Sequence, residues 1–292
     1  MTGRYAPSPT GRLHLGNLRT AMLAWLFARS AGSRFLLRIE DLDAGRVRAE
    51  HEERQLADLR AIGLDWDGEV VRQSARGVLY AEAAARLETY PCFCTRAEIR
   101  EASSAPHGAL PEGAYPGTCR ALTAAERADR ERSGRPPALR VAAGAAVVAF
   151  EDRLAGPCEG VVDDFVIRRN DGAWAYNLAV VVDDGAQGVE EVVRGDDLLD
   201  STPRQLWLAR HLGLADPAYA HVPLVLGPDG ARLAKRHGAV TLGDRPEPPE
   251  EIRALLARSL GLAVSGERPS MAALAERFDP AALPSEPWVL TP

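Results

Sequence analysis

Two segments far apart in the chain carry residues that could hold a nucleoside triphosphate. Residues 4–17 read as a strand, a Pro- and Gly-rich turn and a His14-x-Gly16 step into a helix. The N–H groups of a helix N-terminus bind phosphate, Gly16 permits close approach, and a neutral His14 could hydrogen-bond a phosphate oxygen. Residues 232–236 place Lys235 after a Gly-bearing turn, where its ammonium could offset charge that develops on a polyphosphate.

Each segment alone also fits an ordinary structural role. A His-x-Gly step is common in turns and helix caps, and basic residues beside a turn commonly form a solvated face. The chain contains neither Gly-x-Gly-x-x-Gly nor Gly-x4-Gly-Lys. The two commonest nucleotide-binding folds are therefore unsupported.

The cysteines indicate a metal site in the middle of the chain. Cys92, Cys94 and Cys119 cluster, whereas Cys158 stands apart, which does not resemble a disulfide framework. Three thiolates suit a tetrahedral, structural zinc ion. The alternative is that these are simply buried cysteines, and Cys158 is expected to be a small core residue.

The composition is that of an ordinary globular protein. Of the 292 residues, 46% are hydrophobic and 26% are charged, which argues against a disordered chain. No apolar run approaches the ~18 residues that cross a bilayer, and no charged-then-apolar leader begins the chain, so we expect a cytoplasmic protein. The net charge of −6 argues against indiscriminate nucleic-acid binding, although a local basic patch could still bind RNA.

The hydrophobic pattern predicts an α/β fold. A buried strand over residues 35–39 lies between helical segments, and the apolar run 178–182 reads as a second buried strand. Strands and helices that alternate at this spacing predict a parallel sheet with helices on its faces. Asp183 and Asp184 follow that run, and we expect them to hydrogen-bond loop backbone rather than to bind magnesium.

Taken together, the two nucleotide-type segments resemble the paired signatures of class I aminoacyl-tRNA synthetases, in their glutamyl branch. Residues 6–17 (Ala-Pro-Ser-Pro-Thr-Gly-Arg-Leu-His-Leu-Gly-Asn) match the first signature, and 232–236 (Arg-Leu-Ala-Lys-Arg) match the second. Further blocks at 38–43, 63–67, 176–184 and 193–196 extend the resemblance over about residues 3–245. It implies a Rossmann-like catalytic domain split into residues 1–89 and 177–243, an inserted zinc-bearing subdomain at 90–176, and a short helical stem-contact remnant at 244–292.

The resemblance also implies roles for individual residues. The positions matched to the glutamate site are Arg4, Ser8, Glu40, Tyr176 and Arg194; those matched to the ATP site are Pro7, His14, Gly16, Asn17 and Lys235. His14 and Lys235 would be catalytic, and ATP would act with Mg²⁺. A guanidinium is a planar partner for a carboxylate, and Glu40 could pair with the α-ammonium. Without the resemblance, Arg194 and Glu40 would read as ordinary ion-pair residues.

Two details of the resemblance bear on the chemistry. The implied zinc ligands are Cys92, Cys94, Tyr115 and Cys119, with His107 as the competing fourth ligand. Ala234 stands where the family usually has serine before the catalytic lysine, which removes one possible phosphate donor.

The length of the chain favours one subgroup of this branch. The sequence ends at Pro292, without the anticodon-reading domain of full-length members, and it resembles the short glutamyl-queuosine tRNA(Asp) synthetases. That resemblance implies a monomer that forms glutamyl-adenylate without tRNA and then acylates queuosine in the anticodon stem-loop of tRNA(Asp). The alternatives are a minimal synthetase that charges the 3′ end of tRNA(Glu), a ligase with a non-RNA carrier, and a non-enzymatic tRNA-binding paralogue.

Overall fold

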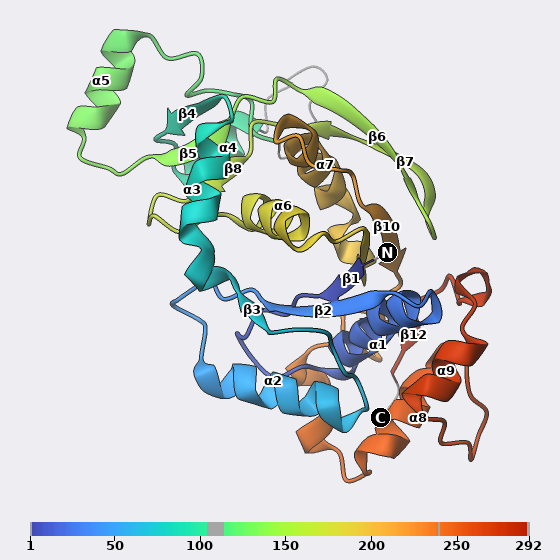
Figure 1. Cartoon of the computed structure of the whole chain (residues 1–292). Coiled ribbons are helices and arrows are strands. Elements are labelled where there is room, and N and C mark those ends of the chain that lie inside the picture. The colour runs from blue at the N-terminus through green and yellow to red at the C-terminus, as the bar shows by residue number, and fades with distance from the viewer. Residues whose placement is uncertain (1, 104–113, 239, 291–292) are drawn as a thin grey trace.

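The computed structural model describes residues 2–103, 114–238 and 240–290 of the chain. The N-terminal part alternates strands and helices, as its hydrophobic pattern predicts (Figure 1). Its elements are β1 (Thr2–Tyr5), α1 (Leu15–Ser30), β2 (Arg34–Ile39), α2 (Ala49–Ala61), β3 (Val71–Arg72), the 3-10 turn η1 (Gln73–Arg76) and α3 (Gly77–Ala85).

The middle of the chain is richer in strands. Its elements are β4 (Thr89–Cys92), α4 (Arg96–Ser103), α5 (Ala124–Arg132), β5 (Ala138–Val141), β6 (Ala146–Asp152), β7 (Gly156–Val162) and β8 (Val166–Arg168). Strands β4, β5 and β8 form a small antiparallel sheet. Helix α5 projects from this region at the upper left of Figure 1. Thr123 caps that helix in a reciprocal capping box with Glu126.

The C-terminal part returns to alternating helices and strands and ends in short helices. Its elements are α6 (Tyr176–Gln187), β9 (Glu191–Gly195), η2 (Asp196–Ser201), α7 (Thr202–His211), β10 (Ala218–Val222), β11 (Val225–Leu226), η3 (Lys235–His237), η4 (Leu242–Asp244), α8 (Pro249–Ser259), α9 (Met271–Arg277), η5 (Pro280–Ala282) and β12 (Trp288–Val289). In the described part of the chain, no helix has both the length and the apolar character that a membrane crossing needs.

The central sheet confirms the predicted α/β fold. Its strand order is β3-β2-β1-β9-β10-β6-β7. Every pairing from β3 to β6 is parallel, and only the β6–β7 hairpin is antiparallel. The hairpin joins the sheet through the pairing of Tyr219 with Asp152. Part of the segment 90–176 therefore extends the central sheet instead of standing apart from it.

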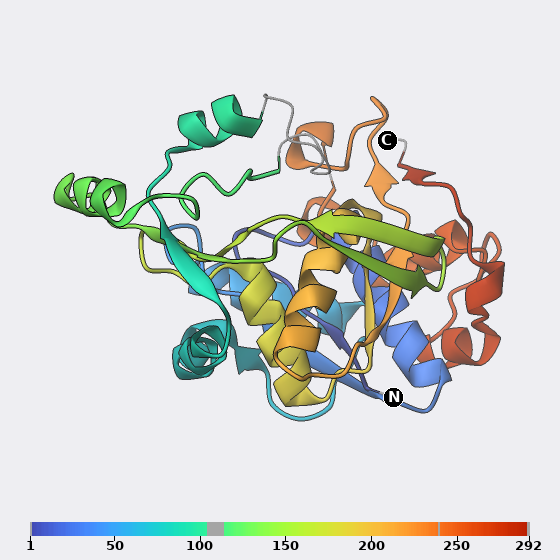
Figure 2. The ribbon, with the colours of Figure 1, turned by 90° about the horizontal axis from the view of Figure 1, so that it is seen from above.

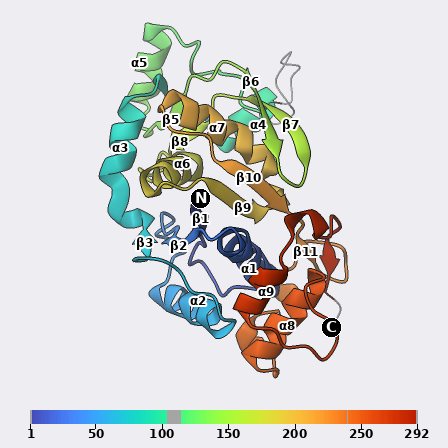
Figure 3. The ribbon, with the colours of Figure 1, turned by 45° about the vertical axis from the view of Figure 1, so that its right-hand side comes forward.

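Helices cover both faces of the sheet, and each face has its own hydrophobic core (Figures 2 and 3). Neighbouring residues on β9 point to opposite faces, so Val193 belongs to the core that includes α1, α8 and α9, while Val192 belongs to the core beneath α3, α6 and α7. Phe27 and Phe278 pack edge to face in the first core, with ring centroids 5.1 Å apart. This packing fixes the C-terminal helices against α1.

One predicted strand is wrong. Residues 178–182 lie within helix α6, whose inward residues pack in the second core. A continuous apolar run satisfies a buried helix as well as a buried strand, so periodicity does not separate the two. Gly188, which ends α6 with a left-handed backbone (φ 63°), is the local signal for the helix.

Candidate active site

A cavity of about 560 Å³ opens at the carboxyl ends of β1, β2 and β9. Parallel strands end together at this edge, and open α/β sheets bind ligands there. The cavity brings together all the predicted substrate and nucleotide residues except Lys235, namely Arg4, Pro7, Ser8, His14, Gly16, Asn17, Glu40, Tyr176 and Arg194.

His14 caps the N-terminus of α1 and faces the cavity. Its Nδ1 accepts a hydrogen bond from the backbone N–H of Asn17 (3.2 Å), and the backbone N–H of His14 donates to Asn17 Oδ1 (3.1 Å). Burial, with a smaller contribution from the charge of Arg232, lowers the pKa of His14 to about 4. The imidazole is therefore neutral at physiological pH, with its proton on Nε2.

Gly16 leaves room for the His14 ring beside the first turn of the helix. A Cβ at this position would come within 3.0 Å of both Cε1 and Nδ1 of His14, and within 3.3 Å of Val225 Cβ. Glycine therefore maintains the position of the imidazole, in addition to leaving room for a ligand.

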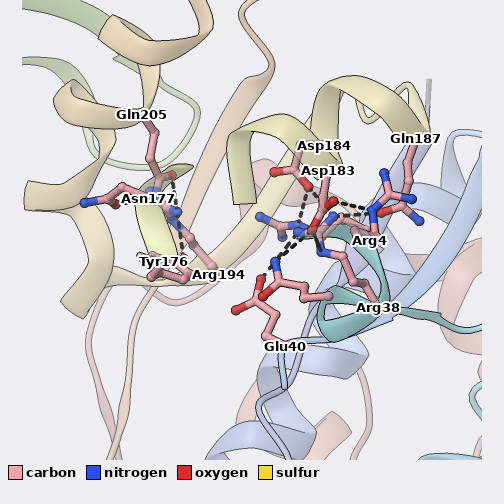
Figure 4. Close-up of polar contacts among 12 residues, drawn as sticks. Arg4, Arg38, Glu40, Tyr176, Asn177, Asp183, Asp184, Gln187, Arg194 and Gln205 are labelled. Carbon is pink, nitrogen blue, oxygen red and sulfur yellow. Dashed lines mark hydrogen bonds and ion pairs between the residues drawn. The ribbon is translucent and has the colours of Figure 1, made fainter. Parts of the chain in front are cut away.

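Arg194 is buried at the end of β9, where neutral groups surround its guanidinium. It donates to His221 Nε2 (3.0 Å), Gln205 Oε1 (2.6 Å) and Thr202 Oγ1 (2.8 Å). Its Nη1 also lies 3.4 Å from the hydroxyl oxygen of Tyr176, a residue that is 37% exposed. Figure 4 shows Tyr176, Arg194 and Gln205 as one group.

Arg4 and Glu40 belong to a second polar group, on β1 and β2 (Figure 4). Asp184 Oδ1 accepts from Arg4 Nε (3.3 Å) and from Arg38 Nη1 (2.7 Å), and Arg38 Nη2 donates to Glu40 (3.4 Å). Burial opposes ionisation of Asp184, but the charges of Arg38 and Arg4 outweigh it and lower the pKa of Asp184. Burial raises the pKa of Glu40, although Arg38 and Arg4 partly offset this effect.

The expectation that Asp183 and Asp184 bond loop backbone is wrong. Both lie on α6, and their carboxylates accept from side chains. Asp183 accepts from Gln73 Nε2 (2.8 Å), from Tyr80 Oη (2.8 Å) and from Arg76. Asp184 therefore links α6 to β1 and β2. Asp183 links α6 to η1 and α3.

The second signature is folded as a turn and a short 3-10 helix, η3. The side chain of Lys235 lies outside the described residues, so its place at the cavity stays a prediction. Arg232 lines the cavity and pairs with Asp197 across it. His237 Nδ1 accepts from the Ala234 N–H (3.0 Å), and its Nε2 lies 3.1 Å from Asp229 Oδ2. These bonds order the backbone on either side of Lys235.

A second cluster lies in the small sheet at β4. The Sγ atoms of Cys92, Cys94 and Cys119 lie within 4.8 Å of one another. Tyr115 Oη lies 3.5 Å from the sulfurs of both Cys92 and Cys94. Within residues 2–103, 114–238 and 240–290, this is the only convergence of three Cys, His, Asp or Glu ligands.

The cysteine cluster fits a zinc ion. A hydrogen bond from Cys119 lowers the pKa of Cys92, and the Tyr115 hydroxyl and Arg140 lower it further, whereas the same hydrogen bond raises the pKa of Cys119. Cys92 is therefore the cysteine that most readily provides the thiolate that a metal requires. Cys158 lies apart, in β7, and is partly exposed, so the expectation of a core residue is wrong. His107 lies outside the described residues, so the choice between His107 and Tyr115 stays a prediction.

Sequence reasoning missed two residues that position the site, Gln55 in the cavity wall and Arg38 behind it. Gln55 on α2 donates to the carbonyl oxygens of Ser8 (3.1 Å) and Gly11 (2.7 Å), and so holds the Pro-rich turn. A single glutamine in a polar helix gives no indication of this role. Arg38 falls inside a matched block, but its pairing with Asp184 depends on a contact across 146 residues.

Comparisons with known proteins agree with this geometry. The family described as "tRNA synthetases class I (E and Q), catalytic domain" matches residues 1–280. The chain is 63% identical to the Glutamyl-Q tRNA(Asp) synthetase of Nocardia farcinica (99% of this chain, 93% of the relative). It is 53% identical to that of Symbiobacterium thermophilum (98% and 95%). A crystal structure of a glutamate tRNA ligase from Elizabethkingia meningosepticum, in complex with its amino acid, superposes with a TM-score of 0.84 at 27% identity, covering 100% of this chain and 67% of that one.

Proposed function

Since the chain belongs to the class I tRNA synthetases of the glutamate and glutamine group, we propose that it activates glutamate with ATP and transfers the glutamyl group to tRNA. Membership in this family makes the protein an aminoacyl-tRNA ligase. The observation that carries the glutamate assignment is the single cavity in which two buried arginines, Arg4 and Arg194, meet Glu40 and Tyr176.

Glutamate has one ammonium and two carboxylates; the cavity offers Glu40 to the ammonium and two buried arginines, Arg4 and Arg194, to the carboxylates. Glu40 would accept the α-ammonium, because its carboxylate lines the cavity and, among the described residues, its hydrogen-bonded cation is Arg38, over a long contact of 3.4 Å. Arg194 and Tyr176 would bind a carboxylate together, since their donor atoms lie 3.4 Å apart. A neutral glutamine side chain would leave a buried guanidinium without its anion, which is the basis for selecting glutamate.

On the ATP side, His14 and the N-terminus of α1 would hold the phosphates. The neutral imidazole would donate from Nε2 to a phosphate oxygen, and Gly16 lets the nucleotide approach the helix end. Lys235 is proposed as the second phosphate contact. ATP enters with Mg²⁺. An oxygen of the α-carboxylate of glutamate attacks the α-phosphorus of ATP, the bond to pyrophosphate breaks, and glutamyl-adenylate is formed. Positioning and charge stabilisation carry such chemistry.

The cysteine cluster would hold one structural zinc ion through Cys92, Cys94, Cys119 and Tyr115. Bound zinc would tie β4 to the loop that carries Tyr115 and Cys119, and so rigidify the small sheet. Residues 90–176 would then be an inserted zinc-bearing subdomain between the two parts of the catalytic domain (1–89 and 177–243), with 244–292 as a helical stem-contact region.

We further propose that the acceptor is queuosine in the anticodon stem-loop of tRNA(Asp). The support is the name shared by the relatives at 63% and 53% identity, Glutamyl-Q tRNA(Asp) synthetase. The cyclopentenediol of queuosine offers a cis-diol like that of a terminal ribose. One of its hydroxyl oxygens would attack the activated carbonyl and release AMP.

The deciding experiment charges tRNA(Asp) with labelled glutamate, using matched tRNA that contains or lacks queuosine. Label only on the queuosine-bearing tRNA is expected. Label on tRNA(Glu) instead would indicate an ordinary minimal synthetase. ATP–pyrophosphate exchange with glutamate in the absence of RNA separates the remaining alternatives, because an enzyme with a non-RNA acceptor exchanges and a tRNA-binding regulator does not.

A further inference from the structure

Behind Arg194, on the side away from the cavity, lies a chain of two further buried side chains. Arg194 and His221 are register partners on the parallel strands β9 and β10. The next strand, β6, ends at Asp152, whose Oδ2 lies 2.6 Å from His221 Nδ1. The side chains of Asp152 and His221 are fully buried. The sheet itself therefore aligns a carboxylate, an imidazole and a guanidinium.

The hydrogen bonds determine where the proton of His221 lies. Arginine only donates, so the contact of 3.0 Å from Arg194 Nε makes His221 Nε2 an acceptor. The ring proton is consequently on Nδ1 and is donated to Asp152. This tautomer is the one in which both contacts are satisfied at once.

Asp152 is held firmly in its ionised form. Burial would raise its pKa, but hydrogen bonds from His221 and from the backbone amides of Ala155 and Leu154 outweigh burial and lower the pKa of Asp152 to about 2. The two amides donate to Oδ1 over 2.9 and 3.0 Å. Oδ2 is thereby left to His221.

The guanidinium of Arg194 has different surroundings from that of Arg4, the other buried arginine of the proposed glutamate site. Arg4 donates directly to the carboxylate of Asp184. Arg194 donates to an imidazole, an amide oxygen and a hydroxyl oxygen, all neutral. The carboxylate of Asp152 lies behind His221, separated from Arg194 by the imidazole ring. Arg194 therefore keeps its positive charge available to an anion in the cavity.

We propose that Asp152 and His221 are positioning residues that hold the guanidinium of Arg194 in the orientation a carboxylate of glutamate requires. This inference rests on the glutamate-binding role proposed above for Arg194. Protonation of His221 would turn Nε2 into a donor that faces the donor Nε of Arg194. The hydrogen bond between them would be lost, and two positive charges would repel each other. The guanidinium would then leave its place, and glutamate affinity would fall.

The charged groups around His221 come from three elements. Asp152 faces it from β6, Arg194 from β9 and Asp196 from η2. From α7, Thr202 and Gln205 contribute only neutral groups. Burial and the charge of Arg194 lower the pKa of His221, against the opposing effects of Asp152 and Asp196, so the neutral form persists through physiological pH.

The test measures glutamate KM and ATP KM by pyrophosphate exchange in the whole protein. Asp152→Asn places an amide N–H against Nδ1 and drives the proton to Nε2. It is expected to raise glutamate KM by about tenfold or more, with ATP KM unchanged. His221→Ala should do the same, and His221→Gln should recover most of the loss, because its amide can donate to Asp152 and accept from Arg194.

Asp164→Asn is the control for lost stability alone. Asp164 is a buried aspartate bonded to Tyr90, and its substitution should leave glutamate KM unchanged.

Two readouts distinguish positioning from support of the fold. Glutamate KM of the wild type should rise more steeply in acid than that of His221→Gln; Glu40 titrates in both proteins, so the difference isolates His221. The ¹⁵N NMR signals of His221 should report a protonated Nδ1 and a bare Nε2. A proton on Nε2, or an unchanged glutamate KM in an active Asp152→Asn variant, overturns the inference. A wild type without glutamate-dependent exchange overturns the proposed function itself, together with the substrate named here.

Discussion

His14 and Asn17 cap the first helix reciprocally, with the Asn17 N–H donating to His14 Nδ1 over 3.2 Å. This bond leaves Nε2 as the donor toward the cavity. His14→Asn keeps a good N-cap residue, but its shorter side chain has no donor at the position of Nε2. We expect kcat for pyrophosphate exchange to fall about 100- to 1,000-fold, the usual cost of a lost donor to a transition state. The melting temperature should stay near that of the wild type; an unchanged kcat would remove His14 from the phosphate site.

Gly16→Ala tests whether the His14 ring must lie against the helix. The new Cβ would crowd the imidazole at 3.0 Å and Val225 at 3.3 Å, so the ring must move. The expected result is a fall of kcat similar to that of His14→Asn. Gly77→Ala is the matched control, because its Cβ would meet only Trp174 Nε1, at 3.8 Å. Equal exchange rates in both variants would show that the ring tolerates displacement.

Elemental analysis of the purified protein should find one zinc ion per chain. Cys92→Ser should lose it and destabilise the small sheet, whereas Cys158→Ser, outside the cluster, should keep it. Tyr115→Phe, which removes the proposed fourth ligand, is expected to weaken zinc affinity by at least about 10- to 100-fold, the range found for loss of a group that only supports a ligand. His107→Ala should leave affinity unchanged. Loss of zinc in His107→Ala, with retention in Tyr115→Phe, would reverse the choice of fourth ligand.

The sheet could be predicted from the sequence because its buried strands are short apolar runs between amphipathic helices. The same criterion gave a wrong prediction for the apolar run 178–182, which is a helix. Burial on all sides removes the periodicity that distinguishes a helix from a strand. The cavity residues were predicted by resemblance to the glutamyl branch, and their shared location follows from strands that end at one edge.

The polar contacts behind the cavity could not be predicted from the sequence. Asp184 meets Arg4 across 180 residues, and Asp152 meets His221 across 69. Such contacts depend on strand order and register, which no local pattern encodes. The tautomer of His221 depends in turn on Arg194 from the neighbouring strand.

Asp183 is expected to be a main support of the fold beside the cavity. It is fully buried and accepts from Gln73, Tyr80 and Arg76. Asp183→Asn turns one acceptor oxygen into a donor and leaves the half-buried guanidinium of Arg76 without its anion. We expect a loss of about 3 kcal/mol in the free energy of unfolding, measured with urea. Asp129→Asn, which breaks an exposed pair with Arg132, should change it by less than about 0.5 kcal/mol.

Glu40→Gln should weaken substrate binding while stabilising the empty protein. Burial raises the pKa of Glu40, against the opposing charges of Arg38 and Arg4. A carboxyl group with a raised pKa in the fold contributes full stability below its unfolded value and loses it as pH rises through its folded value. The variant should therefore melt at or above the wild-type temperature near pH 8, and this difference should vanish as the pH falls toward 4.5. Exposed Glu53→Gln should show no such dependence.

The same substitution removes the anion proposed to bind the α-ammonium of glutamate. Glutamate KM is therefore expected to rise by about 10- to 100-fold, with ATP KM unchanged, since a hydrogen bond to a charged group is lost. Wild-type glutamate KM should also rise in acid, because Glu40 is protonated at a higher pH than an exposed glutamate. A variant that lost stability at pH 8 and kept its glutamate KM would mean that Glu40 serves Arg38 alone, as a structural ion pair.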